Sequence, residues 1–374
     1  MTTMLDWPTP TKESELTPEW LTLALRMSGA ISASDTVTGF TAARIGVGTG
    51  MMSDLFRIEL QYAAGLRPLA AVVAKFSASS AQNRSIAVMM DMYSREVKFY
   101  DERASSISEA TPRAFYHFYD PATHDMVLLL EDLSDYRPGD QAVGCAVADT
   151  ELAIKAVAKL HVSTWHAEQR EDLASWVRID GPVYVMGLGG GAAGGFDLAM
   201  SRFPDVVPPE LLEAAAAYRA AIPALHARMA EGPLALAHGD FRLDNFMFGE
   251  SAEQKPFVML DLQAAIVTKP IHDVVYLLTQ SVDIDVRRRE ERRLIELYHR
   301  ELVELGVSDY SLDQAWEDYR FGALHALEFA ILITAALEPG NERGTAWVRQ
   351  CLGRATQAVV DLDALRLLPD AASA

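Results

Sequence analysis

The first third of the chain is a succession of apolar runs that predict strands. Residues 54–60 (DLFRIEL) alternate apolar and polar side chains, whereas residues 69–76 (LAAVVAKF) are almost entirely apolar. A helical period runs over residues 84–103, between the third and the fourth of these strands. Five strands are expected, at residues 39–45, 54–60, 69–76, 114–119 and 126–131.

The pattern changes at residues 134–140 (SDYRPGD), a turn-rich segment that indicates a domain boundary. Helical periods prevail beyond it, although residues 236–261 form a compact non-helical stretch. Helices are expected at residues 148–168, 208–230, 287–305, 312–337 and 342–366. The sequence thus predicts an α+β protein with three parts: a helical lead-in (1–35), a small lobe of strands with one helix (36–133) and a large helical lobe (134–374).

The charge balance limits the partners of this 374-residue chain. It has 33 Lys and Arg against 52 Asp and Glu, a formal net charge of −19. Because a negative field repels polyanions, the charge argues against nucleic acid and anionic membrane surfaces as partners. The one dense basic stretch, residues 287–293 (RRREERR), is interleaved with acids and is expected to be a solvated helix face.

Cysteine content and hydropathy indicate a compartment. Cys145 and Cys351 are the only cysteines, which argues against a thiolate metal site and fits a reducing environment. The N-terminal residues lack the basic-then-apolar order of a signal peptide, and no apolar run reaches about 18 residues. We therefore expect a cytoplasmic protein that is not inserted in a membrane. The sequence indicates no oligomeric state.

The non-helical stretch carries the strongest chemical signal. Asp240 and Asn245 lie five residues apart in HGDFRLDN, and Asp261 ends the next apolar run, FVMLD. One carboxylate beside an acceptor hydroxyl and two oxygen ligands for Mg²⁺ are what phosphoryl transfer requires. Arg242 is suitably spaced to neutralise charge on the transferred group. The alternative is that these Asp and Asn residues merely form turns.

A lysine in the small lobe supports the same chemistry. Lys75 ends the apolar strand AVVAK, and Glu96 follows 21 residues later on the expected helix. Such a lysine can hold the α- and β-phosphates of ATP while the glutamate orients it. Solvent exposure of Lys75 at a strand end is the alternative, and Glu102 is a competing partner.

Glycines precede this lysine. Gly46, Gly48 and Gly50 lie between two expected strands, where backbone amides could approach phosphates without side-chain obstruction. Ser53 could add a hydroxyl contact. An ordinary hairpin turn would explain the same glycines.

HGDFRLDN and VMLDLQ resemble the catalytic and metal-binding motifs of the aminoglycoside phosphotransferase and choline kinase-like enzymes. The residues of these segments are most similar to those of the ecdysteroid kinase-like branch. The resemblance implies a bilobal protein kinase-like fold that binds ATP between its lobes. It implies Asp240 as catalytic base and Asn245 and Asp261 as Mg²⁺ ligands. The family often has Trp after the metal-binding Asp, where this chain has Leu262.

Two further features follow from the resemblance. Residues 131–133 (EDL) correspond to a hinge at which the backbones of Glu131 and Leu133 would hydrogen-bond adenine. Asp273, in KPIHD, matches an aspartate that braces the catalytic loop, although a helix N-cap is an equal alternative.

Other motifs carry weaker signals. Residues 187–195 contain the dinucleotide pattern G-x-G-x-x-A, but Pro204 and Pro208 follow where a second strand would be required. We expect a mobile flap or a substrate-side insertion there.

The histidines show no metal-binding spacing. His161 and His166 are five apart, so they do not share a helix face and are expected in the core or lining a cleft. His226 and His299 resemble ordinary helix residues.

The sequence therefore predicts an ATP- and Mg²⁺-dependent kinase that phosphorylates a hydroxyl group of a small molecule. The alternatives are a nucleotide-binding pseudokinase or regulatory module without transfer activity, and a dehydrogenase built on residues 187–195. For the acceptor, the acidic charge favours a cationic antibiotic or an amino alcohol. The many Met and Ala residues favour an apolar alcohol such as a sterol or a hydroxyacyl compound, which we slightly prefer.

Overall fold

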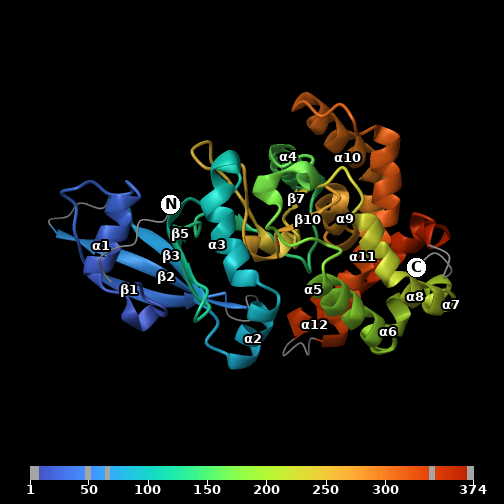
Figure 1. Ribbon diagram of the computed structural model, residues 1–374, viewed down its shortest axis with the longest axis horizontal. Helices are drawn as coiled ribbons and strands as arrows, with labels where there is room; N and C mark the ends of the chain where they lie inside the picture. The colour runs from blue at the N-terminus through green and yellow to red at the C-terminus, as the bar shows by residue number, and fades with distance from the viewer. Residues whose placement is uncertain (1–7, 47–51, 64–67, 337–341, 369–374) are drawn as a thin grey trace. The chain divides into compact units, whose positions relative to one another are not determined.

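A computed structural model describes residues 8–46, 52–63, 68–336 and 342–368 (Figure 1). These residues form two compact units. Unit 1 contains the described residues up to Arg137 together with Leu260–Ala264, and unit 2 contains Pro138–Met259 and the described residues from Ala265 onward. The division lies four residues beyond the boundary expected at residue 133, and a short later segment returns to unit 1.

Unit 1 is built on a five-stranded antiparallel sheet of order β1-β2-β3-β5-β4. All five expected strands are present, as β1 (Val37–Ile45), β2 (Ser53–Tyr62), β3 (Ala71–Ser77), β4 (Ala114–Asp120) and β5 (Asp125–Glu131).

Both faces of this sheet are covered. Because successive side chains of a strand point to opposite faces, Val127 and Leu129 of β5 join one core cluster and Leu128 joins another. Helix α1 (Pro18–Met27) packs on the first face, and α2 (Ala81–Met89) and α3 (Met92–Glu102) pack on the second (Figure 1). Side chains of the lead-in between Leu16 and Ile31 therefore belong to the core of unit 1.

The single helix expected at residues 84–103 is two helices. Asp91 adopts the left-handed conformation (φ 53°), which ends α2 and starts α3. The buried guanidinium of Arg95 donates to the carbonyl of Met90 (2.7 Å) and to that of Asp91 (3.2 Å). The bond to Met90, the C-cap of α2, supplies a partner to a carbonyl at the end of that helix.

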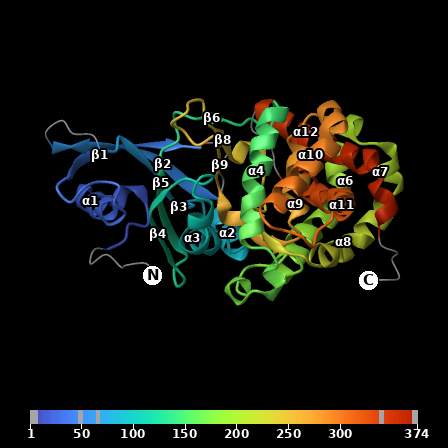
Figure 2. The ribbon, with the colours of Figure 1, turned by 90° about the horizontal axis from the view of Figure 1, so that it is seen from above.

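Unit 2 is mainly helical. Its longer helices are α4 (Val147–Ser163), α6 (Gly190–Arg202), α8 (Ala215–Met229), α9 (Ile271–Gln280), α10 (Ile284–Glu304), α11 (Leu312–Ala336) and α12 (Glu342–Asp361). Helix α11 packs against α6, α9 and α12 (Figures 1 and 2). The short helices are α5 (Pro182–Tyr184) and α7 (Pro209–Glu213).

Short strands frame the non-helical stretch. Strand β7 (Ala235–Ala237) pairs with β10 (Ile266–Thr268), and β8 (Phe246–Phe248) pairs with β9 (Phe257–Met259). A two-residue strand, β6 (Arg137–Pro138), falls where the chain passes from unit 1 to unit 2.

The prediction of a mobile flap at residues 187–195 is wrong. A π-helical turn, Val185–Gly189, leads directly into α6, so the whole stretch is helical. Its glycines permit close packing: a Cβ at Gly191 would come within 2.7 Å of Leu332, and one at Gly195 within 2.7 Å of Ala335, both on α11. Contact with α11 therefore explains glycines that sequence analysis took as a sign of mobility.

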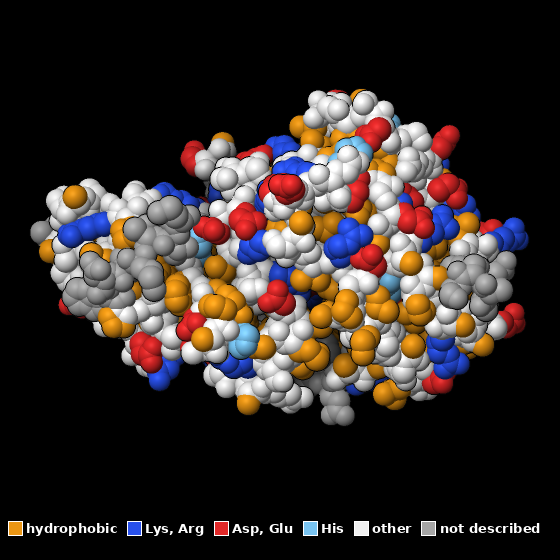
Figure 3. Space-filling view, in the orientation of Figure 1, with side chains coloured by type: hydrophobic (Ala, Val, Ile, Leu, Met, Phe, Trp, Pro, Cys, Tyr) orange, Lys and Arg blue, Asp and Glu red, His pale blue; other side chains and the backbone are white. Residues whose placement is uncertain are grey.

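The basic stretch of α10, expected to be a solvated helix face, is partly buried. Arg287 is 1% exposed and donates to Glu291 (2.6 Å), whereas the more exposed Arg293 pairs with Glu151 (2.7 Å). On the face of unit 2 drawn in Figure 3, acidic and basic side chains are interspersed. None of the helices in the described ranges is both long and apolar enough to cross a membrane.

Candidate active site

Lys75 lies on the α3 side of the sheet in unit 1. On β3, Val72, Ala74 and Phe76 belong to the α1 core, so the alternation of the strand directs Lys75 to the other face. The residue is only 4% exposed, which excludes the alternative of a solvated strand-end lysine.

Two carboxylates hold the ammonium of Lys75. It donates to Oε1 of Glu96 (2.8 Å) and to Oδ1 of Asp261 (2.7 Å). Burial lowers the pKa of Lys75, but Asp261 and Glu96 outweigh burial and raise it above its ordinary value, so the ammonium stays charged. The expected Lys75–Glu96 pair is present, and Glu102 instead lies 3.7 Å from Arg103.

Glu96 is fully buried on α3, and its Oε2 also lies 2.7 Å from the ammonium of Lys75. Burial raises the pKa of Glu96 above its ordinary value, against the opposing charge of Lys75. A carboxylate buried in this way depends on its cation, because an unpaired buried charge is strongly unfavourable.

Asp261 lies in the short segment that returns to unit 1. Its backbone is left-handed (φ 64°), a conformation that is uncommon for a residue with a side chain and that is found enriched at functional sites. Gln263 donates to Oδ2 of Asp261 (3.0 Å), while Lys75 occupies Oδ1. The Lys75–Asp261 contact joins residues 186 positions apart, a separation over which no local sequence pattern predicts contact.

The other residues predicted to contact nucleotide are only partly described. Gly48 and Gly50 lie outside the described residues, whereas Gly46 is described and has a positive φ of 67°. Ser53 is buried, and its hydroxyl has no partner among the described residues.

At the expected hinge, the backbone amide of Glu131 donates to the carbonyl of Arg113 (2.9 Å). The carbonyl of Leu133 accepts from the amide of Tyr136 (3.0 Å). These backbone groups thus take part in local hydrogen bonds, and a role for them in adenine binding stays a prediction.

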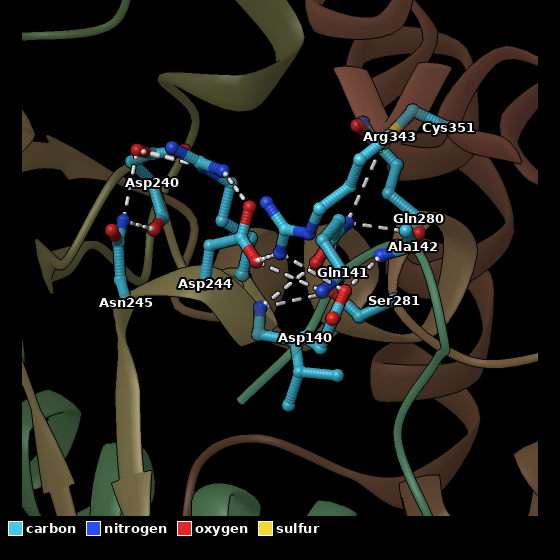
Figure 4. Close-up of polar contacts among 12 residues, drawn as sticks. Asp140, Gln141, Ala142, Asp240, Asp244, Asn245, Gln280, Ser281, Arg343 and Cys351 are labelled. Carbon is cyan, nitrogen blue, oxygen red and sulfur yellow. Dashed lines mark hydrogen bonds and ion pairs between the residues drawn. The ribbon is translucent and has the colours of Figure 1, made fainter. Parts of the chain in front are cut away.

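In unit 2, Asp240 and Asn245 lie together in the loop after β7. The amide nitrogen of Asn245 donates to both the carbonyl and Oδ2 of Asp240, at 2.9 Å each (Figure 4). The side-chain oxygen of Asn245 accepts no hydrogen bond from the described residues, so it is available as a metal ligand. This geometry fits both a metal-binding role and a hydrogen-bonded turn, so the functional interpretation of the pair stays a prediction.

Arg242 clamps Asp240 and Asp244. Its Nε lies 3.0 Å from Oδ1 of Asp240, and its Nη1 lies 3.1 Å from Oδ2 of Asp244. Burial raises the pKa of Asp240, but Arg242, His238 and Asn245 together hold it below its ordinary value. Asp240 is therefore ionised at neutral pH, and with 26% of its side chain exposed it can receive a hydroxyl group.

Asp273 braces this loop. Its Oδ2 accepts from the amide of His238 (2.7 Å) and its Oδ1 from that of Gly239 (3.0 Å). His161, whose other nitrogen meets Tyr298 (2.8 Å), lies 3.1 Å from Oδ2 as well. Pro270 is the N-cap of α9, so the loop-bracing interpretation of Asp273 is confirmed and the N-cap alternative is wrong.

Gln141, which no sequence motif indicates, also holds the loop that carries Asp240. The side-chain oxygen of the buried Gln141 accepts from the backbone amide of Leu243 (3.0 Å) and from the hydroxyl of Ser281 (2.8 Å). The backbone amide of Gln141 donates to Asp244 (2.9 Å) (Figure 4). No spacing or motif marks Gln141, because its role depends on contacts more than 100 residues away.

The comparison with protein families agrees with this geometry. Residues 47–307 match the Ecdysteroid kinase-like family. The chain belongs to this family. The resemblance found in the two motifs is thereby confirmed, over a much longer part of the chain than the motifs themselves. No functionally curated protein sequence matches the chain significantly.

Solved structures share the fold. A Ralstonia eutropha protein assigned as an aminoglycoside phosphotransferase aligns with a TM-score of 0.51 and 14% identity, over 94% of this chain and 99% of its own. The ethanolamine kinase of Plasmodium vivax aligns with a TM-score of 0.50 and 11% identity, over 91% and 86%. This member of the ecdysteroid kinase-like family therefore has the protein kinase-like fold of small-molecule kinases.

Proposed function

We propose that this protein is an ATP- and Mg²⁺-dependent kinase that transfers the γ-phosphoryl group of ATP to a hydroxyl group of a small molecule. The observation that carries the proposal is the buried ammonium of Lys75, held 2.8 Å from Glu96 and 2.7 Å from Asp261. A lysine at this point of the sheet, oriented by a helix glutamate, is suited to hold the phosphates of ATP. Membership of a kinase-like family supports the same reaction.

Asp240 would receive the acceptor hydroxyl. Phosphoryl transfer depends mainly on positioning and on stabilisation of charge, so a carboxylate that is ionised and firmly oriented suits it better than a strong base. Asn245 and Arg242 provide that orientation. Because Arg242 already neutralises Asp240 and Asp244, we assign it to orienting the base as well as to offsetting charge on the transferred group.

Asn245 and Asp261 would hold Mg²⁺. A carboxylate and a free amide oxygen are the hard ligands that this ion prefers, and the side-chain oxygen of Asn245 is available in the described structure. The ion would supply positive charge at the phosphates of ATP. Lys75 would then exchange part of its contact with Asp261 for the phosphates, while Glu96 keeps the ammonium in place.

The acceptor belongs to the small-molecule alcohols. The name of the family points to hydroxylated steroids, in line with the apolar alcohol favoured by composition. Cys145 and Cys351 are both buried free thiols, which supports action in a reducing compartment such as the cytoplasm.

A transfer screen tests the proposal. The protein is incubated with γ-labelled ATP and Mg²⁺ and with sterols, amino alcohols, aminoglycosides or hydroxyacyl thioesters, and Asp240→Asn serves as the control. Label in one acceptor class, absent with the variant, would support the kinase. Binding of Mg²⁺-ATP without transfer to any acceptor would favour the regulatory module instead.

A further inference from the structure

Three potential metal ligands meet in the interior of unit 2, apart from the residues assigned to catalysis. His226 lies on α8, and His325 and Glu328 lie on α11. All three side chains are fully buried, and one ligand atom of each lies within 4.8 Å of the others. His325 and Glu328 are three residues apart, which puts them on the same helix face, a spacing used by metal-binding helical bundles.

The hydrogen bonds of His226 determine which nitrogen carries its proton. Nδ1 lies 2.9 Å from the carbonyl oxygen of Ile179, and since a carbonyl can only accept, Nδ1 must donate. The neutral ring therefore presents the lone pair of Nε2 to Oε2 of Glu328, 2.8 Å away. Histidines that bind metals commonly donate their other nitrogen to a backbone carbonyl in this way.

Two acceptors that face each other need a cation between them. A proton shared by His226 and Glu328 would satisfy that contact alone. It would leave Oε1 of Glu328 and both nitrogens of His325 buried without a partner among the described residues. Buried polar atoms without partners are rare, and an ion is one of their explanations.

The absence of a side chain at Gly189 leaves space beside the three potential ligands. Gly189, in the π-helical turn before α6, closes over the cluster. A Cβ at Gly189 would lie 2.8 Å from Ile222, 3.1 Å from Nε2 of His226 and 3.5 Å from Oε2 of Glu328. A larger residue at this position would therefore crowd both ligand atoms.

We propose that His226, His325 and Glu328 form a binding site for one divalent transition-metal ion of the zinc class. Two imidazoles and one carboxylate are a ligand set that Zn²⁺ accepts, with bond lengths of about 2.0–2.2 Å. Tetrahedral binding would place the ligand atoms about 3.4 Å from one another. Nε2 of His226 and Oε2 of Glu328, which lie 2.8 Å apart, would then separate, whereas ligand atoms up to 4.8 Å apart would approach one another. The ion would cross-link α8 and α11 beneath the glycine-rich segment.

Metal content is the direct test, and it does not depend on the kinase proposal. The full chain is produced in zinc-supplemented medium, purified without a metal-affinity tag and measured by elemental analysis. We expect about one zinc per chain. Production with cobalt should give visible absorption bands typical of a four-coordinate site.

Two ligand variants and one control make the test specific. Glu328→Gln keeps a donor for Nε2 of His226, and His325→Leu removes both unpartnered nitrogens, so both should fold. Changes around metal ligands already weaken binding about 10- to 100-fold, so loss of a ligand should leave less than about a tenth of the zinc.

The control is His166→Asn, which removes a more exposed histidine that lies near Glu168 (3.0 Å) and Asp309 (2.7 Å). This variant should keep its zinc. Wild-type protein without zinc or cobalt, or undiminished zinc in folded Glu328→Gln and His325→Leu, would overturn the proposal.

Discussion

The carboxylate of Asp240 is shared between Arg242 and Asn245, so its charge and its direction are both determined by neighbours in the same loop. Such an arrangement gives each side chain a separable effect. Removal of the carboxylate should abolish alignment of the acceptor, whereas removal of Arg242 should change the proton affinity of Asp240.

Asp240→Asn keeps the shape of the side chain but cannot accept the proton of the acceptor. With an identified acceptor, we expect turnover to fall about 10²- to 10⁴-fold, the usual effect of losing a general base. ATP affinity should stay near that of wild type. Asp244→Asn, in the same loop, should reduce turnover far less. Near wild-type turnover in Asp240→Asn would refute the assignment.

Arg242→Met should shift the pH dependence of kcat/KM. Arg242 helps to hold the pKa of Asp240 below its ordinary value, and burial acts in the opposite direction. Since the ionised form is the active one, activity is lost as pH falls through that pKa. Without Arg242 the pKa rises, so the acidic limb of the profile should move to higher pH. An unmoved limb would mean that another group governs it.

Strand β3 and helix α3 act together through Lys75 and Glu96. Lys75→Ala removes the ammonium, and Glu96→Ala leaves it without its orienting carboxylate. Both should lower kcat/KM for ATP, and the double variant should be hardly worse than Lys75→Ala, because the residues work as one unit.

Two controls accompany that double-mutant cycle. Adenosine has no phosphates and should bind all three variants as well as wild type. Glu102→Ala should have little effect, since Glu102 lies beside Arg103 and not beside Lys75. Fully additive losses of kcat/KM would rule out the coupled pair.

Helix α6 contains neighbouring glycines with opposite surroundings. A Cβ at Gly194 would meet nothing within 4 Å, whereas one at Gly195 would lie 2.7 Å from the Cβ of Ala335. Gly194→Ala should raise the free energy of unfolding by about 0.5–1 kcal/mol, because alanine favours the helix. Gly195→Ala should lower it by about 1–3 kcal/mol through overpacking. Urea unfolding of both variants measures the difference, and equal shifts would contradict the close packing.

The kinase proposal assigns Mg²⁺ ligands to both units, Asp261 in unit 1 and Asn245 in unit 2. Its test therefore concerns the whole molecule. Calorimetric titration with ATP, with and without Mg²⁺, tests it. Asp261→Asn should lose most of the Mg²⁺-dependent gain in affinity, because it removes an anionic ligand. Asn245→Ala should lose less, since a neutral oxygen contributes less charge. Unchanged Mg²⁺ dependence in Asp261→Asn would exclude it as a ligand.

Local pattern was sufficient for the strands of unit 1. The alternation in residues 54–60 and the apolar run of residues 69–76 depend on neighbours in the sequence, and both strands form as expected. Local pattern did not predict the helix break at Asp91 or the helical conformation of residues 187–195. At the helix break, Arg95 donates to the carbonyls of Met90 and Asp91, and the glycines pack against side chains on α11.

The sequence alone indicated the candidate residues for phosphoryl transfer, because HGDFRLDN and AVVAK keep their chemical groups at short spacings. Contacts over long separations required the folded chain: Lys75 with Asp261, Gln141 with the catalytic loop, and His226 with Glu328. A local pattern specifies how a segment turns and which face it buries. It does not specify the distance between residues a hundred positions apart. Only the packing of the folded chain brings such residues within hydrogen-bond distance.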